Sequence, residues 1–202
     1  MHQQTIKQKN MTKEEAFIKY KEIYEFAKIN KPIEDIINVD ELINTPAAPT
    51  ADSGVAYEGA VLFHTIMVWH FANKLLPIYN TISHINTESL AKVIALHQIG
   101  KVGMFTPNTD DWQVKKLGKI YSFTETEACL KFGERSKLTC GNAGVTFTPE
   151  EYEAMSILDK TAEEYENMAK HRTHLSTLLK IASDMAYSVA RERYKLSQKE
   201  NK

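Results

Sequence analysis

The sequence predicts a mainly α-helical protein, and three observations support this class. Long segments repeat apolar residues at the three- to four-residue spacing of an amphipathic helix. Three residues typical of helix starts, Thr12, Asn86 and Thr148, each precede an acidic first turn. Only residues 103–123 combine turn formers with aromatic and β-branched residues, which predicts a short irregular or β-hairpin insertion there.

Composition limits the class of protein. The 202 residues, 43% hydrophobic and 25% charged, fit one large domain with a substantial core. A net charge of -1 argues against a chain that coats nucleic acid or an anionic membrane. Cys129 and Cys140 make no disulfide framework, and polar residues interrupt the apolar stretch 59–76. We therefore expect a cytoplasmic protein with neither a membrane nor a nucleic-acid partner.

The first half of the chain predicts an extension followed by two helices of the main domain. A helix should begin after Thr12 and end near residue 30, and residues 44–54 form a loop by composition. We interpret residues 1–50 as a helix and loop that pack on a domain spanning residues 51–202. Within that domain, helices are expected at 56–79 and from Asn86 to about residue 101.

The second half predicts three more helices, at residues 124–139, 149–159 and 163–196. The last of them carries an apolar stripe formed by Leu175, Leu178, Leu179, Ala182, Met185, Ala186 and Val189. Asp184 lies nearly opposite that stripe, on a side that faces either solvent or a polar cavity.

Two histidines fall on apolar helix faces. His64 shares a side of its helix with Val61 and Val68, and His97 shares one with Val93. A histidine in such a stripe is either a core residue bound by a backbone carbonyl or a ligand delivered into a buried site. Gln98 follows His97 directly and would enter the same buried site if His97 is a ligand.

Several motifs, in order, resemble the HD-domain superfamily of metal-dependent phosphohydrolases. They are residues 58–64 ending in His64, His97 with position 98 before Ile-Gly-Lys, residues 133–136, residues 148–154, and residues 182–186 around Asp184. The resemblance spans about residues 57–194. It implies an HD-domain-like helical bundle in which His64, His97, position 98 and Asp184 would bind a divalent metal.

The chain departs from the family pattern at the metal site. Gln98 replaces the paired Asp, and Phe132 stands where many relatives carry a histidine. An amide oxygen supplies no charge, whereas Mn²⁺ and Mg²⁺ prefer carboxylates. The resemblance therefore implies a vestigial site of His64, His97 and Asp184, holding either no metal or weakly bound Mn, Fe or Mg.

The resemblance also implies which residues would bind a ligand and which would be candidates for catalysis. Lys101 and Arg135 would meet a phosphate, and Gln98 and Lys101 are the candidates for catalysis. Without the resemblance, Lys101 would be a solvated helix end and Arg135 a surface residue.

Two further clusters have simpler interpretations. Lys115, Lys116 and Lys119 form either a small binding patch or an exposed charged hairpin, and the hairpin is preferred. His171 and His174 have metal-site spacing but no adjoining acid, which favours a solvated helix face.

Three functions follow. The first is an inactive or impaired HD-like protein that binds an unknown protein partner or a small phosphorylated ligand. The second is an active metal-dependent phosphohydrolase on a nucleotide or other phosphate ester, and the third a structural subunit of a larger assembly. Position 98 discriminates between the first two, because fold alone does not transfer activity.

Overall fold

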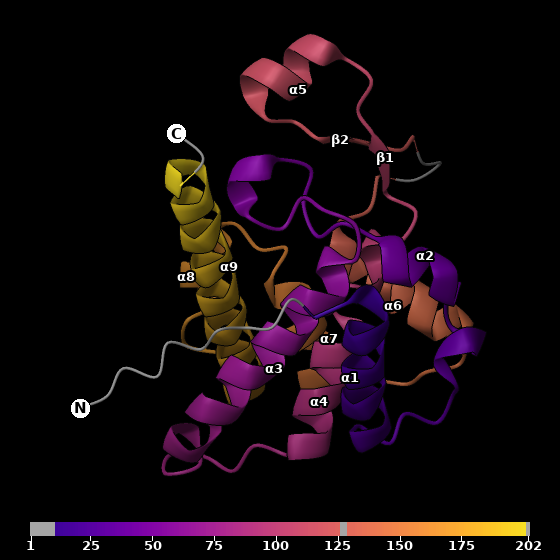
Figure 1. Ribbon diagram of the computed structural model, residues 1–202. Coiled ribbons are helices and arrows are strands. Elements are labelled where there is room, and N and C mark those ends of the chain that lie inside the picture. Colours follow the sequence, from indigo (N-terminus) through magenta and orange to yellow (C-terminus); the bar gives the residue numbers. More distant parts are fainter. Residues whose placement is uncertain (1–10, 126–128, 201–202) are drawn as a thin grey trace.

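The computed structural model describes residues 11–125 and 129–200, and in this part the chain is mainly helical with one small antiparallel sheet (Figure 1). The first five elements are α1 (Lys13–Phe26), the 3₁₀ turn η1 (Ile33–Asp35), α2 (Val39–Asn44), η2 (Ala51–Ser53) and α3 (Ala60–Tyr79). The next five are α4 (Thr87–Leu96), η3 (Ile99–Lys101), β1 (Phe105–Pro107), α5 (Asp111–Leu117) and β2 (Tyr121–Phe123). The last four are α6 (Phe132–Asn142), α7 (Pro149–Ile157), α8 (Ala162–Asn167) and α9 (His174–Glu200). The predicted mainly α class with a short hairpin is confirmed.

The predicted helix starts are formed as the sequence indicates. The side chains of Thr12 and Thr148 each accept a hydrogen bond from the third helical residue, whose glutamate bonds back to the cap. The Asn86 side chain accepts from the backbone of Glu88 and Ser89. Each cap satisfies amide groups that the first helical turn would otherwise leave without partners.

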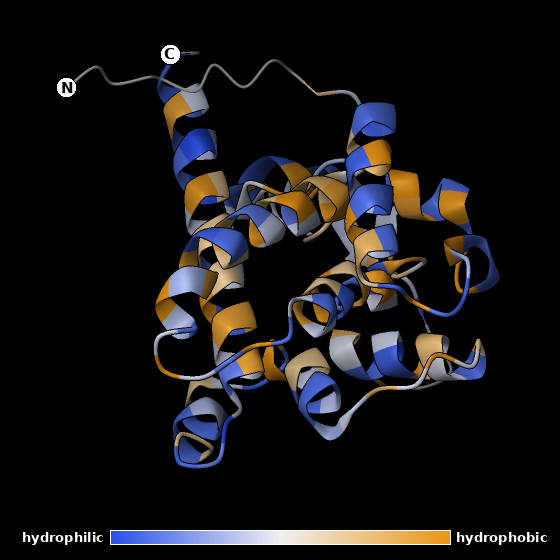
Figure 2. Cartoon of the chain, turned by 90° about the horizontal axis from the view of Figure 1, so that it is seen from below, coloured by the Kyte–Doolittle hydropathy of each residue, from blue (hydrophilic) through white to orange (hydrophobic). Residues whose placement is uncertain are grey.

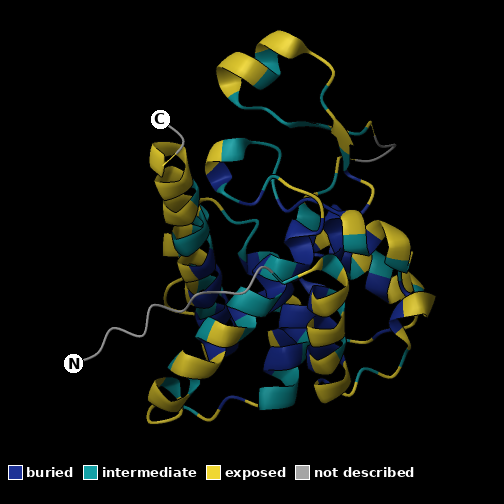
Figure 3. Ribbon diagram, in the orientation of Figure 1, coloured by how far each residue is buried: buried dark blue, intermediate teal, exposed yellow. Residues whose placement is uncertain are grey.

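One hydrophobic core unites these helices. The helices carry both apolar and polar segments, and buried residues gather around α4, which packs against α1, α3 and α7 (Figures 2 and 3). The long helices α3 and α9 pack together, and α1 packs on α3 and α4. Several aromatic and aliphatic side chains of α3 and α9 are only partly buried, and residues of both helices line a cavity.

The sequence-based boundaries are wrong in two places. The helix expected from residue 124 begins only at Phe132 as α6, because the amide of Thr124 still bonds to the Met104 carbonyl of the hairpin region. Residues 126–128 of that predicted helix lie outside the described part of the chain. The predicted helix 163–196 is two helices, α8 and α9. His171 therefore precedes α9 and does not share a helix with His174.

The insertion also contains a helix, α5, which the sequence pattern of residues 103–123 did not predict. Asp110 caps α5 by accepting from the amides of Trp112 and Gln113, so Trp112 is helical and not in a strand. β1 and β2 pair in the antiparallel register Phe105 with Phe123. No residue of α5 is buried, and the insertion extends from one end of the helical body (Figure 1).

Candidate functional site

The segment after α4 places His97, Gln98 and Lys101 in the interior. His97 ends α4, and Gln98 precedes η3, whose last residue is Lys101. Gly100 lets η3 lie directly against α6, since a Cβ there would come within 2.1 Å of the Phe132 carbonyl oxygen. Gly100 therefore allows a close approach of two backbones.

Side chains of α6 fix this segment. The Gly100 amide donates to Ser136 Oγ at 2.8 Å, and Ser136 Oγ donates to the His97 carbonyl at 3.0 Å. Arg135 Nε donates to the Gly100 carbonyl oxygen at 2.9 Å. Arg135 thus binds the backbone of η3, and it is not among the residues that line the cavity described next.

A cavity of about 270 Å³ lies beside this segment. We call it the Lys101 cavity. Its polar lining comes from His97, Gln98, Lys101, Asp159, Lys180, Ser183, Asp184 and Tyr187. The structure therefore brings four of the six residues chosen from the sequence, His97, Gln98, Lys101 and Asp184, to one cavity.

A chain of hydrogen bonds runs through the inner wall of the Lys101 cavity. His97 Nδ1 lies 2.7 Å from the Ile94 carbonyl oxygen, and His97 Nε2 lies 3.0 Å from Gln98 Nε2. A carbonyl oxygen accepts only, so Nδ1 carries the proton and Nε2 accepts from the Gln98 amide. Of the two alternatives for His97, the structure shows the bond to a backbone carbonyl, and hydrogen bonds occupy both of its ring nitrogens.

The series of hydrogen bonds continues to Lys101, which is 7% exposed. Its ammonium donates to the Ala47 carbonyl at 2.7 Å, to Tyr187 Oη at 3.0 Å and to Gln98 Oε1 at 3.2 Å. These three neutral acceptors use all three ammonium hydrogens. The expectation of a solvated helix end for Lys101 is wrong, because the turn of η3 directs the side chain inward.

Both candidate histidines are held neutral. Burial lowers the pKa of His97 to about 4; the bond to the Ile94 carbonyl opposes this shift and the Lys101 ammonium adds to it. Burial also lowers the pKa of His64 well below its usual range, and the charges of Lys101 and His97 act in the same direction. At neutral pH, His64 and His97 therefore add no positive charge beside Lys101.

His64 lies in α3 and faces a second cavity. Its ring contacts that of Tyr187, with centroids 4.0 Å apart, and Nε2 lies 3.5 Å from Ser183 Oγ. Because Tyr187 also binds Lys101, its side chain connects His64 to the Lys101 cavity. His64 itself is not among the residues that line that cavity.

The two aspartates at the Lys101 cavity have protein partners. Both carboxylate oxygens of Asp184 accept from Lys180 Nζ at 2.6 Å, and the Asp184 side chain is 60% exposed. Asp159 Oδ2 accepts from the Gly133 amide at 2.6 Å, and burial raises the pKa of this carboxyl. Asp184 therefore faces solvent at the cavity edge, as one of its two alternatives predicted.

This donor set does not fit a divalent metal as it stands. The nitrogens of His97 and the oxygens of Asp184 are bound within the protein, and the Lys101 ammonium would repel a cation. Within residues 11–125 and 129–200, no three His, Cys, Asp or Glu side chains form a group that could hold a metal ion. Whether the protein binds Mn, Fe or Mg weakly or not at all stays a prediction.

Sequence reasoning missed Tyr187, Ser183 and Asp159. Tyr187 and Ser183 flank the apolar stripe of α9 at a spacing of four residues, so they share a side with Lys180. That spacing was a usable signal. The contact between Asp159 and Gly133 had no signal in the sequence, because it depends on how α6 packs against α7.

Comparison with known proteins returned no family model, curated protein or solved structure that matches this chain. The resemblance to HD-domain proteins thus rests on the motifs themselves. In the part of the chain that the structure describes, no helix is both long and apolar enough to cross a membrane.

Proposed function

We propose that this chain is a degenerate HD-like protein without hydrolase activity, which binds a compact phosphorylated ligand in the Lys101 cavity. One observation carries the proposal. The buried ammonium of Lys101 is bound by three neutral oxygens, and no carboxylate of the described residues lies within ion-pair distance. A buried charge without a counter-charge favours an anionic ligand, and a phosphate oxygen, a typical partner of lysine, would replace one of the three neutral acceptors.

The size and chemistry of the cavity restrict the ligand and the reaction. At about 270 Å³ it is slightly smaller than typical ligand pockets of ~300–1,000 Å³, which supports a compact ligand. The Gln98 amide takes no part in proton transfer, and His97 is neutral with both ring nitrogens in use. These features support binding without hydrolysis. The two free thiols, Cys129 and Cys140, support a cytoplasmic location.

The test is a thermal-unfolding titration with inorganic phosphate, paired with a hydrolysis assay on p-nitrophenyl phosphate in the presence of Mn²⁺. We expect phosphate to raise the melting temperature of the wild type but not of Lys101→Met, and we expect no turnover. Lys101→Arg keeps the charge and serves as the matched control. Turnover that disappears in His97→Leu would instead support the active phosphohydrolase.

A role as an assembly subunit is the second candidate, and the α5 insertion favours it. Trp112 and Leu117 are 62% and 56% exposed on a helix that buries none of its residues. Light scattering on the wild type and on Trp112→Ser tests this role. Association that depends on concentration and is lost in the variant would support it, and two monomers would exclude self-assembly through α5.

A further inference from the structure

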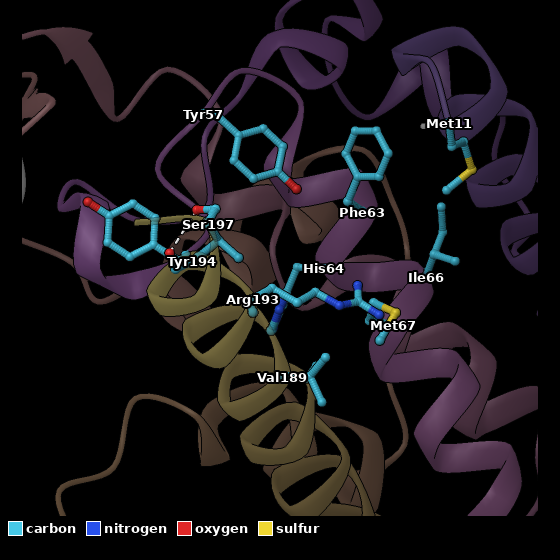
Figure 4. A pocket seen from close by; sticks show the side chains of 14 residues that line it. Met11, Tyr57, Phe63, His64, Ile66, Met67, Val189, Arg193, Tyr194 and Ser197 are labelled. Atoms are coloured by element: carbon cyan, nitrogen blue, oxygen red, sulfur yellow. Dashed lines mark hydrogen bonds between the residues drawn. The ribbon is translucent and has the colours of Figure 1, made fainter. Parts of the chain in front are cut away.

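The second cavity, here called the His64 cavity, has the volume of a small-molecule site. It measures about 500 Å³ and lies between α3, α9 and the loop around Gly54 (Figure 4). Gly54 adopts a left-handed φ of 73°, and a Cβ there would come within 2.3 Å of the Ala190 carbonyl oxygen. The loop is therefore held tightly against α9 and closes one side of the cavity.

The walls of the His64 cavity are apolar on both helices. The lining side chains are Phe63, Ile66 and Met67 of α3 and Ala186, Val189 and Ala190 of α9. They recur every three to four residues, so each helix presents one apolar stripe to the space. Such walls favour the hydrocarbon part of a ligand, because its burial removes apolar surface from water.

Besides the hydroxyl groups of Tyr57, Tyr194 and Ser197, the lining of this cavity contains two nitrogen-bearing side chains, His64 and Arg193. His64 is 2% exposed and neutral, and its one polar neighbour among the described residues is Ser183 Oγ at 3.5 Å. Arg193 is exposed, and in the described part of the chain it forms neither an ion pair nor a hydrogen bond. Figure 4 shows the Arg193 side chain extended across the cavity, with its guanidinium beside Met67.

We propose that the His64 cavity binds a medium-chain organic carboxylate. The chain would lie between the apolar stripes of α3 and α9, and the carboxylate would bind the Arg193 guanidinium, which matches its planar geometry. Glu192, the acidic neighbour of Arg193 in the sequence, pairs with Lys195, and no ion pair joins Arg193 to a residue that the structure describes. This site is independent of the phosphate proposed at Lys101.

The experiment is calorimetric titration of the full chain with decanoate, and with decyltrimethylammonium as a probe of equal length and opposite charge. We expect one decanoate site and much weaker binding of the cation. Arg193→Gln should reduce decanoate affinity by at least ~tenfold, the effect of losing one charge-assisted hydrogen bond. Arg191→Gln, an exposed arginine of the same helix that does not line the cavity, should leave the affinity unchanged.

Val189→Trp fills the cavity and should abolish binding in a variant that melts cooperatively. Because Arg193 is exposed, its variant should fold even if the tryptophan variant does not. Absence of decanoate binding to the wild type would overturn the proposal. Equal affinity for the two probes, or an Arg193→Gln variant that binds like the wild type, would overturn it as well.

Discussion

The two cavities, which are linked by the ring contact between His64 and Tyr187, use their polar groups in opposite ways. In the Lys101 cavity, His97, Gln98 and Lys101 already bind one another or the backbone. In the His64 cavity, the walls are apolar, and Arg193 forms no ion pair or hydrogen bond with any residue that the structure describes. The first cavity therefore contains a preformed polar network around one charge, whereas the second combines apolar walls with one arginine.

This difference shows why residue types alone do not define a site. His64 and His97 look alike in the sequence, since each is a histidine on an apolar helix face. The structure gives them different roles, because His97 belongs to a hydrogen-bonded chain whereas His64 contacts an aromatic ring and lines an apolar space. Substitutions on the two sides of Tyr187 should therefore have separate effects.

The largest expected effect belongs to Lys101. Lys101→Met should abolish phosphate binding and lower the free energy of unfolding by about 1–3 kcal/mol for each buried acceptor that loses its donor, such as the Ala47 carbonyl. Chemical denaturation and decanoate titration together check this. Decanoate binding at the His64 cavity should persist, and its loss would contradict the independence of the two cavities.

The next effect concerns pH. An unfolded histidine has a pKa near 6.5, whereas folded His97 has a pKa of about 4, so the unfolded state takes up the proton first as pH falls. The stability that neutral His97 contributes is complete above pH 6.5 and is lost between pH 6.5 and 4. That loss amounts to about 3 kcal/mol.

His97→Leu isolates this contribution. At pH 7 the variant should be about 1–3 kcal/mol less stable than the wild type, because Ile94 and Gln98 lose their partner. Urea denaturation toward pH 4 should narrow this gap, since the variant has no proton to take up at that position. Parallel pH profiles for the two proteins would show that His97 is not held neutral by burial.

Sequence reasoning predicted the fold better than the site. Caps and periodicity identified most helices, because those signals are local, and the bond from His97 to a carbonyl one turn earlier was equally local. The burial of Lys101 was not predicted, since it depends on Ala47 and Tyr187, which lie 54 and 86 residues away in the sequence. Long-range packing of this kind leaves no mark in the periodicity of a single helix.

The smallest effect belongs to Asp184. Its ion pair with Lys180 spans one helical turn at the surface, so Asp184→Asn should change stability by no more than about 0.5 kcal/mol. Thermal unfolding of the variant at low and moderate salt measures this. A large loss of stability, or a loss of bound metal, would give Asp184 a role that its exposed position does not indicate.

We propose that Gln98 keeps metal out of the Lys101 cavity, because its amide occupies His97 Nε2 and supplies no charge. Gln98→Asp removes that donor and adds a carboxylate, which Mn²⁺ prefers as a ligand. Melting curves of the wild type and Gln98→Asp, each with and without Mn²⁺, test the claim directly, since a ligand of the folded state raises the melting temperature. We predict an upward shift in the variant alone, and equal shifts in both proteins would contradict the claim.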